Sequence, residues 1–282
     1  MMFHRALPNK IINQFGFTLI EIIVVMVVLS ILAIGSVKFI SLGAMGYVDT
    51  TRRSNIAATA TLINEKISRL IRDALPGSIR VSDDQSCIEF LPVLAATQYI
   101  QAPFETASNE VTAAPLDNNN FRDFGYLSIY PITSDVNDIY DNTNSPGFVS
   151  VEIARIVNTV NGAIVMNFDN ADTFRFLKRS PQKRLYVVDE PNAFCQIGNN
   201  LFYYRNYGFV PDKTNLMATV SSSVPNRLLI GSGIMANSLQ FTYLPSSLRR
   251  NSIVAYELEL QDPSRAEETL VVNQEIQIRN VP

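Results

Sequence analysis

The residue that most needs a chemical explanation is Glu21. It stands five residues into the stretch GFTLIEIIVVMVVL and is the only charged residue between Phe17 and Val37. A carboxylate in apolar surroundings is costly to keep charged unless it has a partner. The sequence therefore predicts that Glu21 has either a partner or a function that requires its charge.

Histidine usage restricts the catalytic chemistry. The only histidine is His4, in a segment that we expect to be removed. Without it the chain cannot build a Ser-His-Asp triad, a Cys-His pair or a histidine-ligated zinc site. Catalysis by a pair of carboxylates stays open because 26 acidic residues are present. We expect no enzymatic activity and no cofactor.

Two cysteines, Cys87 and Cys195, both lie in the C-terminal part of the chain. In a cytosolic protein they would most often be free thiols in the core. In an exported protein, a pair with no odd member indicates a disulfide. Because export is favoured below, we expect these two cysteines to be joined.

An acidic stretch could in principle bind a hard cation. Oxygen ligands gather within ten residues at Asp135, Asp138, Asp141, Asn142 and Asn144. The spacing of an EF-hand is absent, and acidic loops are usually only solvated. The three aspartates are weak candidates for calcium.

The apolar segment from Phe17 to Val37 has 21 residues, which span roughly 30 Å as a helix, the thickness of a bilayer core. It could be a secretory signal peptide, a membrane anchor or a buried core helix. It is longer than the apolar part of a signal peptide, and the rest of the chain offers little to surround it. Basic residues flank it on both sides and do not decide its orientation. The cysteines favour export of the C-terminal side.

A helical pattern continues beyond this segment. Apolar residues recur at spacings of three and four up to Ala74, which predicts one buried helix face, and Pro76-Gly77 ends the pattern. We expect a helix from about Thr18 to Leu75, and a kink or local melting near Gly35–Gly46 stays open. The apolar positions after Val48 are Ile56, Ala60, Ile63, Ile67, Leu70, Ile71 and Ala74.

The rest of the chain predicts an antiparallel, β-rich head, and hence an α+β fold. Several segments alternate apolar and polar residues, as half-buried strands do. Residues 97–120 and 134–147 are rich in Asn, Asp, Pro and Ser and predict loops. The aromatic cluster Phe202–Tyr207 favours sheet packing over a binding surface. The predicted strands are 86–91, 126–130, 149–157, 163–168, 184–188, 201–205, 239–244, 253–260 and 270–279.

The segment from Lys10 to Glu21 resembles the class III prepilin signal of type IV pilins and type II secretion pseudopilins. It has the basic leader, then Gly16, Phe17 and Glu21, then the uninterrupted apolar run. The resemblance implies that a prepilin peptidase cuts after Gly16 and methylates the new N-terminal Phe17. It also implies that Glu21 meets the N-terminal amine of a neighbouring subunit. The attraction between the carboxylate and the cationic amine would offset the cost of removing both charges from water.

The C-terminal part is similar to the larger minor pilins. The order of the Leu239-x-Phe241-x-Tyr243 strand, the Leu248-Arg249-Arg250 loop and the closing segment EIQIRNVP carries this likeness. The likeness is to the O-type minor pilins of the mannose-sensitive haemagglutinin (MSHA) pilus. The likeness implies a lollipop-shaped subunit with a long helix and a globular head.

We therefore expect a leader at 1–16, a membrane and assembly helix at 17–76 and a periplasmic head at 77–282. The expected protein is a single-pass inner-membrane minor pilin for priming or the tip of an MSHA-type pilus, with its N-terminus cytoplasmic. Its partners would be other pilins, the prepilin peptidase and the inner-membrane assembly platform. A net charge of -3 argues against nucleic acid as a partner. A type II secretion pseudopilin and a tip adhesin remain alternatives.

Overall fold

The computed structural model describes residues 16–116, 125–158, 162–169, 172–222, 226–246, 251–262 and 265–278. The chain divides into two compact units, Met1–Ser54 and Asn55–Pro282. The leader residues up to Phe15, the loop at 248–250 and Arg279 lie outside the described residues.

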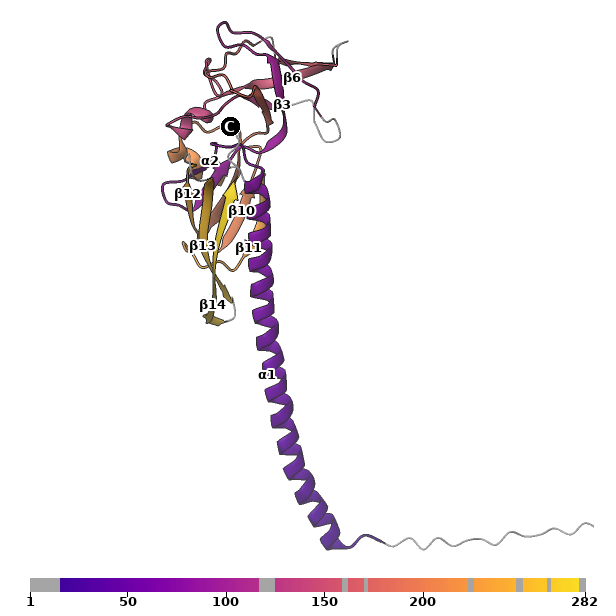
Figure 1. Ribbon diagram of the computed structural model, residues 1–282. Coiled ribbons are helices and arrows are strands. Elements are labelled where there is room, and N and C mark those ends of the chain that lie inside the picture. Colours follow the sequence, from indigo (N-terminus) through magenta and orange to yellow (C-terminus); the bar gives the residue numbers. More distant parts are fainter. Residues whose placement is uncertain are drawn as a thin grey trace, which may run out of the picture. The chain divides into compact units, whose positions relative to one another are not determined.

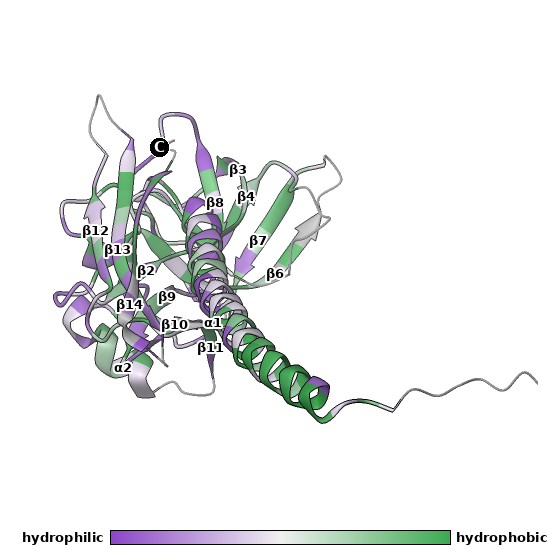
Figure 2. Cartoon of the chain, turned by 90° about the horizontal axis from the view of Figure 1, so that it is seen from below, coloured by the Kyte–Doolittle hydropathy of each residue, from purple (hydrophilic) through white to green (hydrophobic). Residues whose placement is uncertain are grey.

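The first unit consists of the N-terminal part of helix α1 (Leu19–Arg72). Nearly all of its side chains before Asp49 are apolar or small, and every described residue from Gly16 to Val48 is exposed. Figure 2 shows the apolar colouring of this part of α1. The helix continues without a break through Gly35, Gly43 and Gly46.

The second unit is built around the C-terminal part of α1. Ala60, Ile63, Ile67 and Ile71 are buried on one face of the helix, at the spacings that the sequence predicts. They share a core with side chains from two antiparallel sheets. Figure 1 shows the strands of these sheets beside this part of α1. The five-stranded sheet has the order β1-β2-β9-β10-β11 and the three-stranded sheet the order β12-β13-β14. Their bounds are β1 Arg80–Val81, β2 Cys87–Phe90, β9 Asn192–Ile197, β10 Asn200–Tyr204, β11 Arg227–Ser232, β12 Gln240–Leu244, β13 Ser252–Asp262 and β14 Arg265–Ile278.

The remaining six strands close into a barrel in the order β3-β4-β7-β6-β5-β8. All of them come from the chain between β2 and β9, which are themselves neighbours in the five-stranded sheet. The barrel is therefore an insertion between two paired strands, with its own apolar interior. Its strands are β3 Val93–Gln101, β4 Glu110–Ala113, β5 Tyr126–Ser128, β6 Val149–Asn158, β7 Ile164–Phe168 and β8 Arg184–Val188.

Short helices cover parts of this framework. The 3-10 turn η1 (Val136–Ile139) lies between β5 and β6. The turn η3 (Lys213–Asn215) leads into α2 (Leu216–Ser222), whose Leu216 and Val220 pack beside the two cysteines.

The α+β class, with a long N-terminal helix and an antiparallel β-rich remainder, is confirmed. The nine predicted strands all occur, with shifts at their ends. The helix ends at Arg72, three residues earlier than expected. Residues Asp73–Leu75 instead lie beside the segment that leads from β2 into β3, where the Val93 N–H donates to the Asp73 carbonyl. The prediction of a loop over residues 97–120 was wrong at two places, because β3 extends to Gln101 and β4 occupies Glu110–Ala113. Residues 134–147 contain no strand, as predicted.

Candidate functional site

The start of α1 has a defined cap. The Glu21 backbone N–H donates to the Thr18 hydroxyl oxygen at 3.3 Å and to the Thr18 carbonyl at 3.1 Å. Thr18 is thus the residue that satisfies the first free N–H groups of the helix. The spacing Thr18-x-x-Glu21 is that of a capping box, a signal that could have been found in the sequence. An acid at this position also interacts favourably with the positive end of the helix dipole.

The structure places Gly16 and Phe17 immediately before this cap, in an exposed segment outside the helix. Phe17 has 78% of its surface exposed. Phe17 and Glu21 are four residues apart, which is about one helical turn. The segment thus brings the peptide bond after Gly16, the backbone nitrogen of Phe17 and the carboxylate of Glu21 to one end of the helix.

Behind the cap, α1 is long and apolar enough to cross a membrane, the one helix among the described residues for which this holds. Its apolar window is entirely exposed within the chain. Side chains as large as Ile34 and Phe39 show 72% and 79% of their surface. An apolar surface of this extent requires a covering of lipid or protein.

Cys87 and Cys195 form a disulfide. They are directly opposite each other on the antiparallel strands β2 and β9. Both side chains are fully buried, in a small core with Leu216 and Val220 of α2. The bond joins the two strands between which the barrel is inserted.

The three aspartates considered as calcium ligands are occupied by local hydrogen bonds. Asp135 accepts from the Asn137 N–H and so caps η1, and Asp138 accepts from the Thr133 hydroxyl. Asp141 accepts from the Thr143 hydroxyl and from the Asn144 amide. Within the described parts of the chain, no group of three or more His, Cys, Asp or Glu residues could hold a metal ion.

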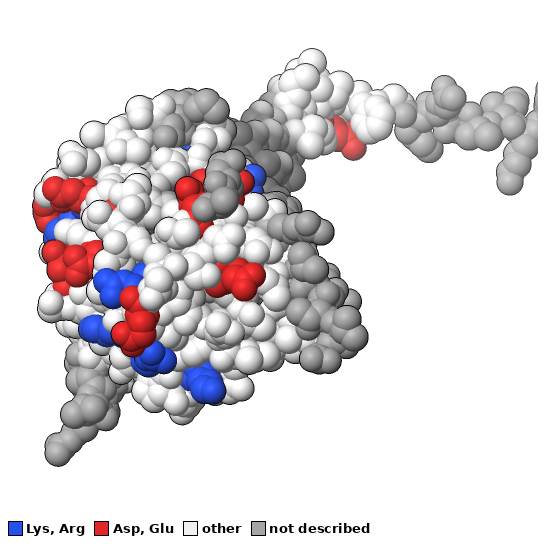
Figure 3. Space-filling view, turned by 90° about the horizontal axis from the view of Figure 1, so that it is seen from above, with Lys and Arg blue, Asp and Glu red and all other residues white. Residues whose placement is uncertain are grey.

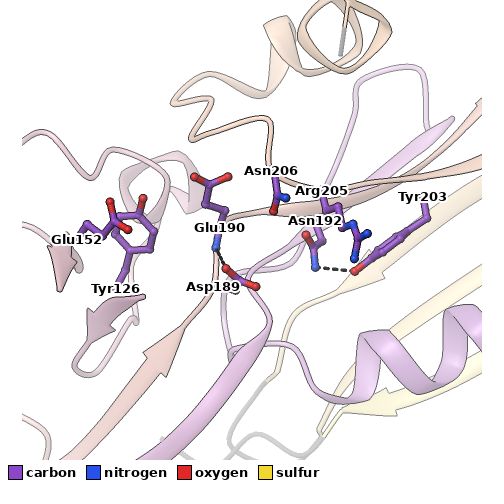
Figure 4. Close-up of a pocket in the computed structure, with 8 residues that line it drawn as sticks. All are labelled: Tyr126, Glu152, Asp189, Glu190, Asn192, Tyr203, Arg205 and Asn206. Carbon is purple, nitrogen blue, oxygen red and sulfur yellow. Dashed lines mark hydrogen bonds between the residues drawn. The ribbon is translucent and has the colours of Figure 1, made fainter. Parts of the chain in front are cut away.

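A pocket of about 360 Å³ lies where the barrel meets the five-stranded sheet (Figure 4). The barrel contributes Tyr126 and Glu152, which are opposite each other on β5 and β6. Asp189 and Glu190 come from the connection between β8 and β9, and Tyr203 comes from β10. Asn192, Arg205 and Asn206 complete the lining.

The pocket is polar and carries more negative than positive charge. Burial raises the pKa of Glu190, and the nearby carboxylates of Asp189 and Glu152 act in the same direction, while the Gly208 N–H opposes them. Burial, together with the carboxylates of Glu152, Glu190 and Asp189, raises the pKa of Tyr126 to about 12, so its hydroxyl stays protonated at neutral pH. The Asn192 amide donates to the Tyr203 hydroxyl at 2.6 Å. Such a surface suits a polar ligand better than an apolar one.

A buried ion pair lies between the sheet and the barrel connection. The Arg80 Nε donates to the Glu89 Oε2 at 2.5 Å, and both side chains are buried. The Arg80 guanidinium also donates to the Asn137 side chain of η1 and to two backbone carbonyls, and it stacks over the Tyr140 ring at 3.7 Å. Burial raises the pKa of Glu89 and the Arg80 charge opposes this. Glu89 is fully buried, whereas Arg80 and Asn137 also line a second pocket of about 560 Å³.

Charges elsewhere on the described surface are mixed. Figure 3 shows acidic and basic side chains interspersed on the face seen from above. The aromatic cluster around β10 is largely packed. Tyr204 is buried, the Phe202 ring lies tilted beside the Tyr204 ring, and the Tyr207 hydroxyl donates to Glu89 at 2.7 Å. Sheet packing thus accounts for these rings, and Tyr203 also lines the pocket.

Comparison with known proteins gives one match. The model of the prokaryotic N-terminal methylation motif matches residues 12–37. No curated protein and no solved structure is significantly similar to this chain. The match covers the cap, Glu21 and the whole apolar segment from Phe17 to Val37, and leaves the barrel and both sheets without a comparison.

The motif match and the exposed apolar helix together support a type IV pilin-like or pseudopilin protein. Proteins with this motif are structural subunits rather than enzymes, and nothing in the described residues positively indicates catalysis. The helix is compatible with the membrane anchoring that is typical of pilins. The match also suggests processing by a prepilin peptidase and assembly with other pilins.

Proposed function

We propose that this chain is a minor pilin-like subunit that either primes the assembly of a type IV pilus of the MSHA type or occupies its tip. In this proposal residues 1–16 are a leader, 17–76 the membrane and assembly helix and 77–282 the head. The observation that carries it is the matched motif at residues 12–37 followed by an exposed apolar helix. The cut after Gly16 keeps the apolar run in the product, and Phe17 becomes the methylated N-terminus.

Glu21 is proposed to pair with the N-terminal amine of a neighbouring subunit. An α-amino group is cationic at neutral pH, because its pKa is about 8. Its attraction to a carboxylate in an apolar helix bundle offsets the desolvation of both groups. Either charge alone would be costly there, so the pair specifies the register between neighbours.

The length of the helix supports a membrane stage before assembly. From Phe17 to Lys38 the chain rises about 31 Å, which matches the core of a bilayer. The ammonium of Lys38 would then reach one interface while the cut end of the chain lies at the other. We place the N-terminus in the cytoplasm and the head in the periplasm, where the disulfide is stable.

The size of the second unit supports a position at the tip. The barrel adds six strands to the framework of helix and sheets. A head enlarged in this way would be difficult to repeat along a shaft. Labelling that found the subunit evenly spaced along pili would exclude the tip position.

Adhesion is a second candidate function, and the polar pocket between barrel and sheet favours it. A ligand there would contact Tyr126, Glu190 and Tyr203. The test is binding of the full chain in detergent to a glycan array, with Tyr203→Ala as the variant. Binding that this variant abolishes would support an adhesin, whereas binding that it leaves unchanged would not.

The direct test of the proposed function is replacement of Gly16 by leucine. The expected result is accumulation of the uncut chain in the membrane and loss of the subunit from pili. Normal cleavage of the variant would refute the proposal. Neighbouring genes for a pilus ATPase, rather than for a secretin-linked secretion system, would separate a pilin from a pseudopilin.

A further inference from the structure

The polar pocket between the barrel and the five-stranded sheet is lined by three carboxylates, those of Glu152, Asp189 and Glu190. None of the three forms an ion pair with a described residue. Acidic side chains elsewhere in the second unit do have basic partners, as Glu89 has in Arg80. The pocket therefore gathers negative charge that the described part of the fold does not neutralise.

Bringing these carboxylates together has a cost in the free chain. Burial favours the uncharged form of Glu190, and the charges of Asp189 and Glu152 act in the same direction, so the pKa of Glu190 is raised. Like charges that a fold holds together in a cleft are a mark of a functional site rather than of a stabilising one. A bound cation would remove this repulsion.

Asn192 supplies an independent observation in the same pocket. It lines the cavity from the start of β9, and only 7% of its surface is exposed. Its amide nitrogen donates to the Tyr203 hydroxyl at 2.6 Å. Its amide oxygen accepts no hydrogen bond from any residue that the structure describes. A buried acceptor without a donor is costly, so this oxygen calls for an N–H or O–H group from a ligand or from water.

The positive charge of Arg205 lies toward one side of the pocket. In Figure 4, Asp189 and Glu190 occupy the middle of the lining, with Glu152 on one side and Asn192 and Arg205 on the other. Arg205 is close enough to Tyr203 for its charge to act on the Tyr203 hydroxyl. A cation is therefore most favoured in the middle of the pocket and on its barrel side, away from Arg205.

The kind of cation follows from the spacing and type of the acceptors. Within the described residues, no group of three or more His, Cys, Asp or Glu could hold a metal ion. The pocket volume of about 360 Å³ also exceeds what a single ion needs. An ammonium group is larger than a metal ion and brings three N–H donors and no acceptor, which complements carboxylates and a free amide oxygen.

We propose that this pocket binds a primary ammonium group, carried either by a lysine side chain of another protein or by a small amine. Such a group is charged at neutral pH. It would lie beside Glu190 and Asp189, with the amide oxygen of Asn192 as a further acceptor. The inference rests on the second candidate function, which places a ligand in this pocket, and it adds the chemical class of that ligand.

The experiment is calorimetric titration of the full chain in detergent with three probes of one size class. They are the Nα-acetylated amides of lysine, of norleucine, which lacks the ammonium, and of trimethyl-lysine, which keeps the charge but has no N–H donor. We expect the lysine probe to bind roughly 10-fold more tightly than either of the other two. Equal binding of the norleucine probe would overturn the role of charge. Equal binding of the trimethyl-lysine probe would overturn the role of the N–H donors.

Ethanolamine separates the two sources of the ammonium group. Binding of ethanolamine as tight as that of the lysine probe would identify a small amine as sufficient. Tighter binding of the lysine probe would identify the longer side chain as part of the ligand. Failure of both to bind would refute the proposal.

Glu190→Gln tests the site within the protein. It removes one charge and keeps the shape of the side chain, and it should weaken binding of the lysine probe by roughly 10-fold. Glu110→Gln is the matched control, because Glu110 is an exposed residue of β4 outside the pocket and its loss changes the net charge equally. The control should change binding by less than about twofold.

Thermal unfolding verifies that both variants are folded, and Glu190→Gln should not be destabilised because it relieves repulsion. Equal effects of the two variants on binding would show a general attraction by net charge and would overturn the proposal. A glycan array without binding would instead refute adhesion to glycans and leave the ammonium site standing. A Gly16→Leu chain that is still cut would refute the pilin assignment, so these failures are distinguishable.

Discussion

Cys87 and Cys195 lie directly opposite each other on neighbouring strands, although they are 108 positions apart in the sequence. The chain between them forms the entire barrel. The disulfide therefore closes the base of an inserted module and holds it to the five-stranded sheet at the point where the chain leaves and returns. In a subunit that moves from a membrane into a filament, the disulfide would keep the barrel attached to the five-stranded sheet.

Loss of the disulfide should lower the stability of the second unit. For a loop of this length the chain-entropy model gives about 5 kcal/mol of the free energy of unfolding. We expect the Cys87→Ala, Cys195→Ala double variant to lose roughly that amount. Urea unfolding followed by tyrosine fluorescence measures it, with the reduced native chain as a comparison. An unfolding midpoint that neither the double substitution nor reduction changes would contradict this assignment.

The ion pair of Arg80 and Glu89 should behave as a coupled unit. Both side chains are buried, so Arg80→Met alone leaves an unpaired buried carboxylate and should cost about 3–5 kcal/mol of the free energy of unfolding. The double variant with Glu89→Leu should lose less than the single Arg80→Met variant. Urea unfolding of the four proteins in a double-mutant cycle gives the coupling energy. Additive losses would show that the two groups do not depend on each other.

Tyr204 offers a substitution that should increase stability. Its hydroxyl oxygen is buried and, among the described residues, has no hydrogen-bond partner. Tyr204→Phe removes this group and should raise the free energy of unfolding by about 1 kcal/mol. Tyr207→Phe is the matched control, because the Tyr207 hydroxyl donates to Glu89 at 2.7 Å and its loss should destabilise. Thermal unfolding of both variants would refute this if Tyr204→Phe proved the less stable of the two.

Glu21→Gln should separate processing from assembly. Glutamine keeps the size of the side chain and is accepted at the same position of a capping box, so the helix should still begin at Leu19. The charge that would pair with a neighbour's amine is lost. We expect normal removal of the leader, a normal amount in the membrane and roughly 10-fold less subunit in sheared pili. Quantitative immunoblots of both fractions measure this, and unchanged incorporation would exclude charge pairing at Glu21.

The sequence was most informative where a local pattern determines the structure. The apolar periodicity at Ala60, Ile63, Ile67 and Ile71 predicted the buried face of α1, and alternation predicted strands such as β13. The strand β3 was missed because Thr97–Gln101 is part of a segment rich in loop-forming residues. Its place is determined by pairing with β8, whose partner residues lie about ninety positions along the chain.

The barrel and the pocket could not be predicted in the same way. Closure of the barrel depends on pairings between strands that are distant in sequence, such as Tyr126 with Val188. The pocket needs Glu152 of the barrel to meet Glu190 of the connection between β8 and β9 and Tyr203 of the sheet. No spacing in the sequence indicates that these residues come together. The N-terminal site is different, because Gly16, Phe17 and Glu21 are consecutive parts of one motif.

The central claim is that the mature chain begins at Phe17 and enters a filament. The most direct measurement is mass spectrometry of the N-terminal peptide of the subunit recovered from sheared pili. The predicted result is a peptide that begins with an N-methylated Phe17 and lacks Gly16 and all residues before it. An unmodified N-terminus that begins before Gly16, or a terminus that begins beyond the apolar run after Val37, would contradict the account.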